Sequence, residues 1–182
     1  MLLKETILFT LPLFIAGLLH HLLIIKYNLF EFLAKPIDFH IKLANKRLLG
    51  NSKTFRGFVM VVLFTGFSMG IINAFLEIPL KLNPFLAGMV LGLGYSLGEL
   101  PNSFLKRRLG IKESSLPHGS FGLLLHILDQ TDSVIGSLIF LPIIYSPSLI
   151  LIIVLFFVGT ALHILVDVSL YLFGYKKSIL NQ

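Results

Sequence analysis

Five apolar stretches, each close to the length that a helix needs to cross a lipid bilayer, dominate this chain of 182 residues. They cover about residues 6–25, 57–76, 84–103, 121–145 and 147–173. Crossing the hydrocarbon takes about 20 residues of α-helix. Since 55% of the residues are hydrophobic and the mean hydropathy is +0.89, the chain is predicted to be an integral membrane protein. We expect an all-α fold, a polytopic bundle of about five transmembrane helices.

The five stretches leave no room for a separate soluble domain, so residues 1–182 are expected to form one transmembrane domain with links at 26–56 and 104–120. The first stretch is expected to be a retained helix, because only Lys4 precedes it and no small-residue cleavage pattern precedes His20. Cysteine is absent, which excludes a disulfide framework and thiolate metal ligation.

Basic residues gather on one side of the predicted membrane. The link 26–56 carries seven, the link 104–120 carries four and the tail carries Lys176 and Lys177, which together make 13 of 15. An excess of Lys and Arg marks cytoplasmic loops, so we expect the N-terminus outside and both links and the C-terminus in the cytoplasm. Many Lys and Arg residues beside a membrane only set the orientation of the helices. This alternative to a binding role stays open for each of these cations.

Two acidic residues in the fourth stretch, Asp129 and Asp132, indicate chemistry. Residues three apart share a helix face, so both carboxylates can bind one divalent cation. A membrane helix rarely buries two carboxylates for packing. Glu99, at the cytoplasmic end of the third stretch, can join them. The pattern predicts a Mg²⁺ site formed by Asp129, Asp132 and Glu99, and the alternative is a buried ion pair with Lys or Arg.

Cations flank these acids in two places. Lys106 and Arg107 follow the third stretch, and Lys53 and Arg56 border a Gly/Asn/Ser turn that leads into the second. Backbone N–H groups at a helix N-terminus receive phosphate, and Lys and Arg hold its oxygens. No Walker loop is present. We therefore expect these four side chains to bind phosphate groups at the cytoplasmic surface.

Further polar and small residues have less specific interpretations. His163 and Asp167 lie one turn apart in the fifth stretch and are predicted to form polar contacts between helices or to support the site. The glycine tracts 66–70 and 88–94 predict close helix approach, or a groove for lipid chains. No chemistry is assigned to the remaining loop and interfacial histidines, which are His20, His21, His40 and His118.

The order of these motifs resembles a known family. The run 103–107, Ser-Phe-Leu-Lys-Arg, followed by Asp129 and Asp132, is similar to the Ser-x-x-Lys-Arg and Asp-x-x-Asp pattern of membrane CTP-dependent cytidylyltransferases. Within that group, which includes the CDP-diacylglycerol synthases, the chain is most similar to the CDP-archaeol synthase family. Pro36-Ile37-Asp38 and the run 49–57, Leu-Gly-Asn-Ser-Lys-Thr-Phe-Arg-Gly, match two further motifs of that family.

The resemblance spans about residues 35–136, with a weaker match at His163. Where the family usually has Gly-Asp, this chain has Gly98-Glu99. The resemblance implies transfer of a cytidylyl group from CTP to a membrane lipid phosphate, giving a CDP-activated lipid and pyrophosphate with Mg²⁺ as cofactor. The implied catalytic residues are Asp129, Asp132, Lys106 and Arg107. The implied substrate-binding residues are Lys53, Thr54, Arg56, Ser103, Lys106 and Arg107.

The expected partners are CTP, a membrane lipid phosphate and the bilayer, with no nucleic acid, and a homo-oligomer is left open. The expected location is the cell membrane, with the active site facing the cytoplasm. A non-catalytic lipid-phosphate carrier or scaffold is the alternative, since it needs the basic surface but not the acid pair. A CDP-alcohol phosphotransferase is disfavoured, because its Asp-Gly-x-x-Ala-Arg run is missing. The acceptor lipid stays open between diacyl, dialkyl ether and polyprenyl-linked phosphates.

Overall fold

The computed structural model describes residues 1–113, 115, 117, 119–172 and 174. Five long helices form the bundle: α1 (Leu2–Tyr27), α2 (Phe55–Leu76), α3 (Pro84–Arg108), α4 (Ser120–Ile144) and α5 (Leu149–Leu172). The first link contains a 3-10 helix, η1 (Glu31–Leu33), and two short strands, β1 (Lys42–Leu43) and β2 (Lys46–Arg47). The helical class is therefore confirmed. The expected cytoplasmic tail with Lys176 and Lys177, and His118, lie outside the described residues.

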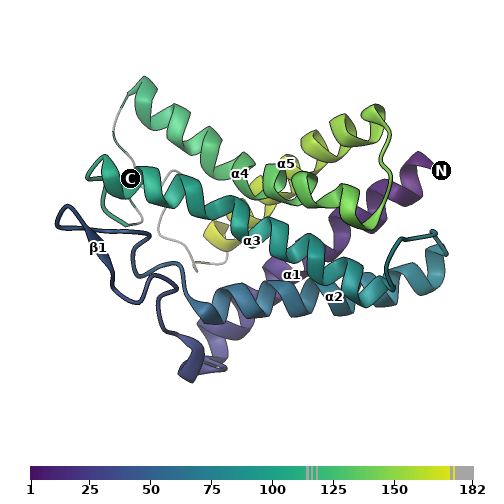
Figure 1. Ribbon diagram of the computed structural model, residues 1–182, viewed down its shortest axis with the longest axis horizontal. Helices are drawn as coiled ribbons and strands as arrows, with labels where there is room; N and C mark the ends of the chain where they lie inside the picture. The colour runs from purple at the N-terminus through teal and green to yellow at the C-terminus, as the bar shows by residue number, and fades with distance from the viewer. Residues whose placement is uncertain (114, 116, 118, 173, 175–182) are drawn as a thin grey trace.

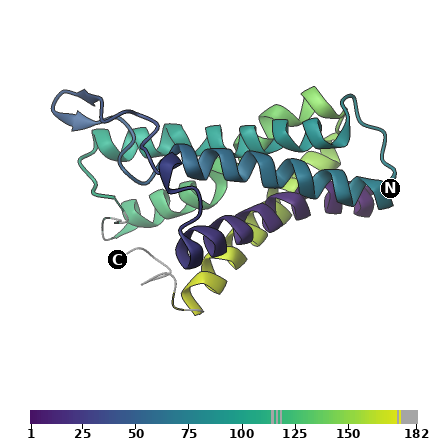
Figure 2. The ribbon, with the colours of Figure 1, turned by 90° about the horizontal axis from the view of Figure 1, so that it is seen from below.

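The five helices run alternately in opposite directions (Figure 1). The short connections α2–α3 and α4–α5 and the N-terminus lie at one end of the bundle, and both long links lie at the other (Figures 1 and 2). Short connections make successive helices antiparallel neighbours. The two basic links therefore meet at one end, as the charge pattern requires, and the side of the membrane that this end faces stays a prediction.

Four helices within the described residues are long and apolar enough to span a membrane, namely α1 over Leu2–Leu23, α2, α4 and α5. The expected fifth span, α3, carries Glu99, Asn102 and three successive cations in its second half. It packs mainly between α2 and α4, so other helices cover its buried polar face. It also continues through Lys106 to Arg108, beyond the predicted end at 103, since cations in a last turn complement the helix dipole.

Glycines set the closest helix contacts. A Cβ atom added to Gly136 of α4 would lie 2.6 Å from the Gly98 Cα atom of α3, and one added to Gly88 would lie 2.8 Å from the Gly66 Cα atom of α2. No real side chain tolerates such distances. Of the two uses predicted for the glycine tracts, the structure therefore shows close helix approach at Gly66 and Gly88.

The apolar core lies toward the end with the short connections. Its buried members include Leu8 of α1, Met69 of α2, Leu91 of α3, Leu141 of α4 and Leu151 of α5. Because lipid is as apolar as these side chains, van der Waals packing between the helices is what stabilises this core. The half of the bundle nearer the long links is left for polar side chains.

The β-hairpin in the first link was not expected. Ala44 and Asn45 form its two-residue turn with φ of 49° and 61°, and Lys42 pairs with Arg47. Two left-handed central residues give the turn type whose twist matches a hairpin. Alanine rarely adopts this conformation, so the local sequence does not predict the turn.

Candidate active site

A polar cavity of about 230 Å³ opens at the end of the bundle that carries the long links. All but two of the residues predicted for the site line it. They are Lys53, Glu99, Ser103, Lys106, Arg107, Asp129 and Asp132. We call it the carboxylate cavity. Its walls come from the end of the first link, the second half of α3, the second link, the first half of α4 and part of α5.

Asp129 and Asp132 are joined by one amide group. The Asn102 Nδ2 atom donates to Asp129 Oδ1 at 2.6 Å and to Asp132 Oδ2 at 2.9 Å. Lys106 forms an ion pair with Asp129, and Asp132 also accepts from the Ser133 backbone N–H. The predicted shared orientation of the two carboxylates is therefore present. Of the two alternatives for Asp129, the structure shows the ion pair, and the cation site stays a prediction.

The cluster has the donor set that Mg²⁺ prefers. Two carboxylates lie within reach of one small cation, and the buried Oδ1 atom of Asn102 has no hydrogen-bond partner among the described residues. Carboxylate and amide oxygens are hard ligands that suit Mg²⁺. Within the described part of the chain, no three His, Asp or Glu residues are placed to hold a metal by themselves. A cation here would therefore need substrate oxygens or water as further ligands.

Glu99, one turn before Asn102 on α3, also lines the cavity and pairs with Lys53. Desolvation opposes the charge on Lys53, but the Glu99 carboxylate outweighs it and raises the pKa of the lysine. Lys53 therefore remains a cation at neutral pH. Metal ligation by Glu99 stays a prediction, because its carboxylate is held by this lysine.

Arg107 is ready to bind an anion. Its side chain is only 11% exposed, its Nε atom has no partner among the described residues, and the nearest carboxylate in an ion pair, Glu113, lies 3.9 Å away. A buried guanidinium without a close carboxylate gains strongly from a phosphate.

Asp38 organises the first link. Its carboxylate accepts hydrogen bonds from the Arg47 guanidinium and from the N–H groups of Leu49 and Gly50, at 2.6 to 3.2 Å. Burial alone would raise its pKa, but these bonds hold the pKa of Asp38 well below its usual range. Arg108 of α3 fastens the hairpin by donating to three of its carbonyl groups. The turn before Lys53 is thereby held over the cavity.

The two remaining predicted residues lie outside the carboxylate cavity. Thr54 caps α2 by accepting from the Gly57 N–H at 3.2 Å. Arg56 donates to the Asn28 Oδ1 atom at 2.7 Å, toward the end of α1. Substrate contacts of these two residues stay predictions.

Sequence reasoning gave no role to several residues of this region. Asn102, treated only as an uncharged neighbour, lies one turn before Lys106 on the same helix face, and this spacing was the available signal. Glu113 accepts from the Asn51 N–H at 2.7 Å, in the turn expected to receive phosphate.

The polar contact predicted between α5 and another helix at His163 and Asp167 is confirmed. Gln130 of α4 donates to Asp167, and its backbone carbonyl lies against His163.

Known proteins are similar to this chain over most of its length. A family model described as CarS-like CDP-archaeol synthase matches residues 1–179. A CDP-archaeol synthase of Methanopyrus kandleri is 32% identical over 151 residues, which are 79% of this chain and 78% of the relative. A CDP-archaeol synthase of Sulfolobus acidocaldarius is 36% identical over 107 residues, 58% of each chain.

A solved structure of an intramembrane enzyme for archaeal membrane lipid biosynthesis shares the fold. It matches with a TM-score of 0.63 over 91% of this chain and 92% of that one, at 21% identity. With this fold and its apolar helices, the chain is a multi-pass membrane protein.

Proposed function

The chain belongs to the CarS-like CDP-archaeol synthase family, and from this we propose that it transfers a cytidylyl group from CTP to a membrane lipid phosphate. The observation that carries the proposal is the carboxylate cavity, where Asp129 and Asp132 share one amide donor beside Lys106 and Arg107. Acidic and basic groups in one cavity suit a reaction between a triphosphate and a second phosphate.

The proposed reaction is a displacement at phosphorus. An oxygen of the lipid phosphate attacks the α-phosphorus of CTP, a new P–O–P bond forms, and the bond to the bridging oxygen breaks. Pyrophosphate leaves with that bond's electron pair. Both reactants are anions, so catalysis consists of screening their repulsion and aligning them.

Different residues of the cavity bind, align and screen the two phosphate groups. Arg107 binds triphosphate oxygens, and Lys53, placed between link and helix, holds the acceptor phosphate near the α-phosphorus. Asp129 and Asp132 would hold Mg²⁺, which when bound supplies positive charge to the phosphate oxygens. Asn102 and Lys106 fix the orientation of the two carboxylates.

The named relatives favour a dialkyl ether lipid phosphate as the acceptor. The position of the cavity at the basic end of the bundle supports a cytoplasmic active site, where CTP is available. The cell membrane is therefore the proposed location.

The test is an assay of purified protein with CTP, Mg²⁺ and a panel of diacyl, dialkyl and polyprenyl phosphates. We expect a CDP-lipid, detected by its mass, and one pyrophosphate for each CDP-lipid, with the dialkyl acceptor used best. Binding of lipid phosphate without any pyrophosphate release would contradict the proposal and favour a carrier.

A further inference from the structure

A second polar cavity adjoins the first. It has a volume of about 290 Å³, and α1 contributes His20 and His21 to its wall. We call it the histidine cavity. It shares Lys53, Glu99 and His163 with the carboxylate cavity, so the Lys53–Glu99 ion pair stands between the two chambers.

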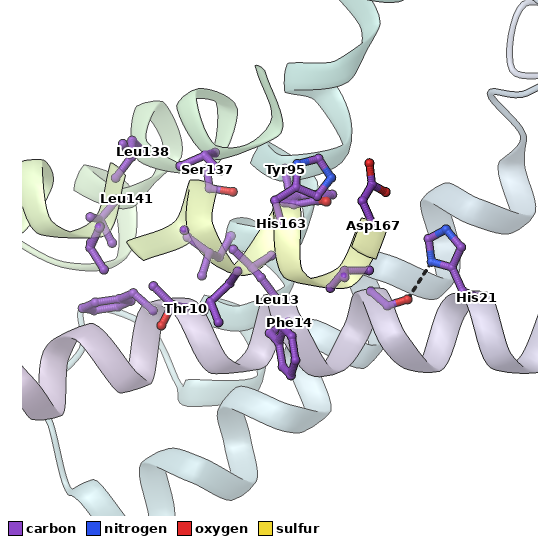
Figure 3. Close-up of a pocket in the computed structure, with 18 residues that line it drawn as sticks. Thr10, Leu13, Phe14, His21, Tyr95, Ser137, Leu138, Leu141, His163 and Asp167 are labelled. Carbon is purple, nitrogen blue, oxygen red and sulfur yellow. Dashed lines mark hydrogen bonds between the residues drawn. The ribbon is translucent and has the colours of Figure 1, made fainter. Parts of the chain in front are cut away.

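A third, apolar cavity continues from the histidine cavity into the bundle between α1, α4 and α5 (Figure 3). Leucine, phenylalanine and valine side chains such as Leu13, Phe14 and Val134 form most of its wall. Its ionisable residues His21, His163 and Asp167 lie toward one end, and the hydroxyl residues Thr10 and Ser137 lie farther along the cavity (Figure 3). These three residues also line the histidine cavity, so the two chambers meet there.

We propose that the histidine cavity binds the phosphate monoester of the acceptor and that the apolar cavity, with a volume of about 70 Å³, takes the first few methylene groups of one hydrocarbon chain of the same molecule. This inference rests on the proposed function and places its second substrate. The three cavities match the order of the parts of that substrate. The reacting oxygen lies nearest the carboxylates, the phosphate lies beside Lys53 and the histidines, and the start of the chain lies in the apolar cavity. An apolar pocket with a few convergent polar groups at one end is the usual form of a site for an amphipathic ligand.

The histidines are oriented for such a headgroup. The His21 Nδ1 atom lies 2.8 Å from the Gly17 carbonyl oxygen, which only accepts, so Nδ1 carries the proton (Figure 3). The Nε2 atom of His21 is then left for another partner. The buried Nδ1 atom of His20 has no hydrogen-bond partner among the described residues. In one neutral tautomer the His20 Nδ1 atom can donate to a phosphate oxygen, and the His21 Nε2 atom can accept from the hydroxyl of a phosphate monoanion.

Gly17 of α1 marks the passage between the phosphate chamber and the chain chamber. It lines both cavities, and a Cβ atom added to it would meet nothing within 4 Å. Gly136, by contrast, lies against backbone and could not carry a side chain. Glycine weakens a helix interior, and at position 17 no close helix contact explains it. The absence of a side chain at position 17 keeps the space between the two cavities open.

Gly17→Leu therefore blocks the passage without a backbone clash. Gly70→Leu is the matched control, because Gly70 is also helical, has only one atom at 4.0 Å from an added Cβ, and lines none of the three cavities. The probe is a dialkylglycerol phosphate in detergent, with binding to the purified protein measured by native mass spectrometry in the absence of CTP.

We expect Gly17→Leu to weaken binding of this probe by about tenfold or more, since losing contacts to about two methylene groups has that effect. Gly70→Leu should bind as the natural protein does. Equal binding by Gly17→Leu and the natural protein would overturn the placement of the chain. Because this readout needs no turnover, it separates failure of the placement from failure of the proposed reaction.

A second pair of variants tests the phosphate. His21→Ala should lower affinity for the dialkylglycerol phosphate and leave affinity for the same dialkylglycerol without phosphate unchanged. His126→Ala is the control, since this α4 histidine lines none of the three cavities. Loss of both affinities to the same extent in His21→Ala would overturn the assignment of the headgroup.

Discussion

Helix α4 has two faces that are packed in opposite ways. Against α3, the backbones touch through Gly98 and Gly136, and the polar groups above this contact are tied together by Asn102. Against α1 and α5, a cavity remains, and Gly17 of α1 faces open space. Glycines thus bring two helices together on one side and leave space open on the other.

This difference suits the two substrates of the proposed reaction. Charged groups act well on a phosphate only when they are held within a fraction of an ångström, which close backbone contact provides. A hydrocarbon chain has no directional contacts and needs only space lined with apolar atoms. The face of α4 that packs against α3, which we call the rigid face, accordingly carries the carboxylates. The face of α4 toward α1 and α5 borders the apolar cavity.

The largest expected effect comes from removing one negative charge on the rigid face. Asp132→Asn keeps the side-chain size but removes the negative charge, so turnover should fall by about 100-fold or more, as when one preorganised electrostatic group is lost. The Mg²⁺ concentration for half-maximal rate should rise. CDP-lipid formation over a Mg²⁺ titration measures both. Near-normal turnover in Asp132→Asn would leave the carrier as the better interpretation.

A comparison of two arginines tests how far the CTP-binding site extends beyond the rigid face. Arg107→Ala should raise the KM for CTP by about 10- to 100-fold, because charge-assisted hydrogen bonds are worth about 1.5–3 kcal/mol. Arg56→Ala should change this KM less, since Arg56 contacts Asn28 rather than the carboxylate cavity. Steady-state kinetics at saturating lipid phosphate decide the point. An equal effect of the two substitutions would mean that CTP extends beyond the cavity toward Arg56.

A smaller effect concerns the link above the rigid face. Asp38→Asn should lower the free energy of unfolding by about 2 kcal/mol at neutral pH, because Arg47 loses its buried partner. The folded-state pKa of Asp38 lies below 3.8, so its stabilising contribution is full above that pH and is lost as the pH falls through the lower folded-state value. Thermal melts of both proteins should therefore converge in acid. A constant difference down to low pH would contradict this role of the carboxylate.

The smallest expected effect concerns orientation and leaves activity intact. Because the chain has no cysteine, Lys42→Cys in the hairpin and Leu82→Cys in the α2–α3 turn each introduce a single thiol. Both positions are exposed and lie at opposite ends of the bundle. An impermeant reagent added outside intact cells should label Cys at position 82 alone. The reverse pattern would place the carboxylate cavity outside.

Several features of this fold follow from local sequence. Apolar stretches of about 20 residues predict the helices, and the expected fourth stretch, 121–145, differs from α4 by one residue at each end. The spacing of Asp129 and Asp132 fixes their shared helix face. The charge of the two links predicts that they meet at one end, as in the structure.

Other features depend on which helices become neighbours. Asn102 bridges the two carboxylates only because Gly98 and Gly136 bring α3 against α4. The direction of Arg56 depends on how α1 ends, and nothing near Arg56 in sequence indicates it. The proposed roles of His20 and His21 depend in the same way on a cavity that five separate segments enclose.

The most direct test of the two-face account compares Gly136→Ala with Gly17→Leu in one kinetic experiment, varying CTP and dialkylglycerol phosphate separately. Gly136→Ala pushes α3 from α4 and should lower kcat with both substrates saturating. Gly17→Leu should raise the KM for the lipid phosphate alone, leaving kcat and the KM for CTP near those of the natural protein. The same kinetic pattern in both variants would contradict the account.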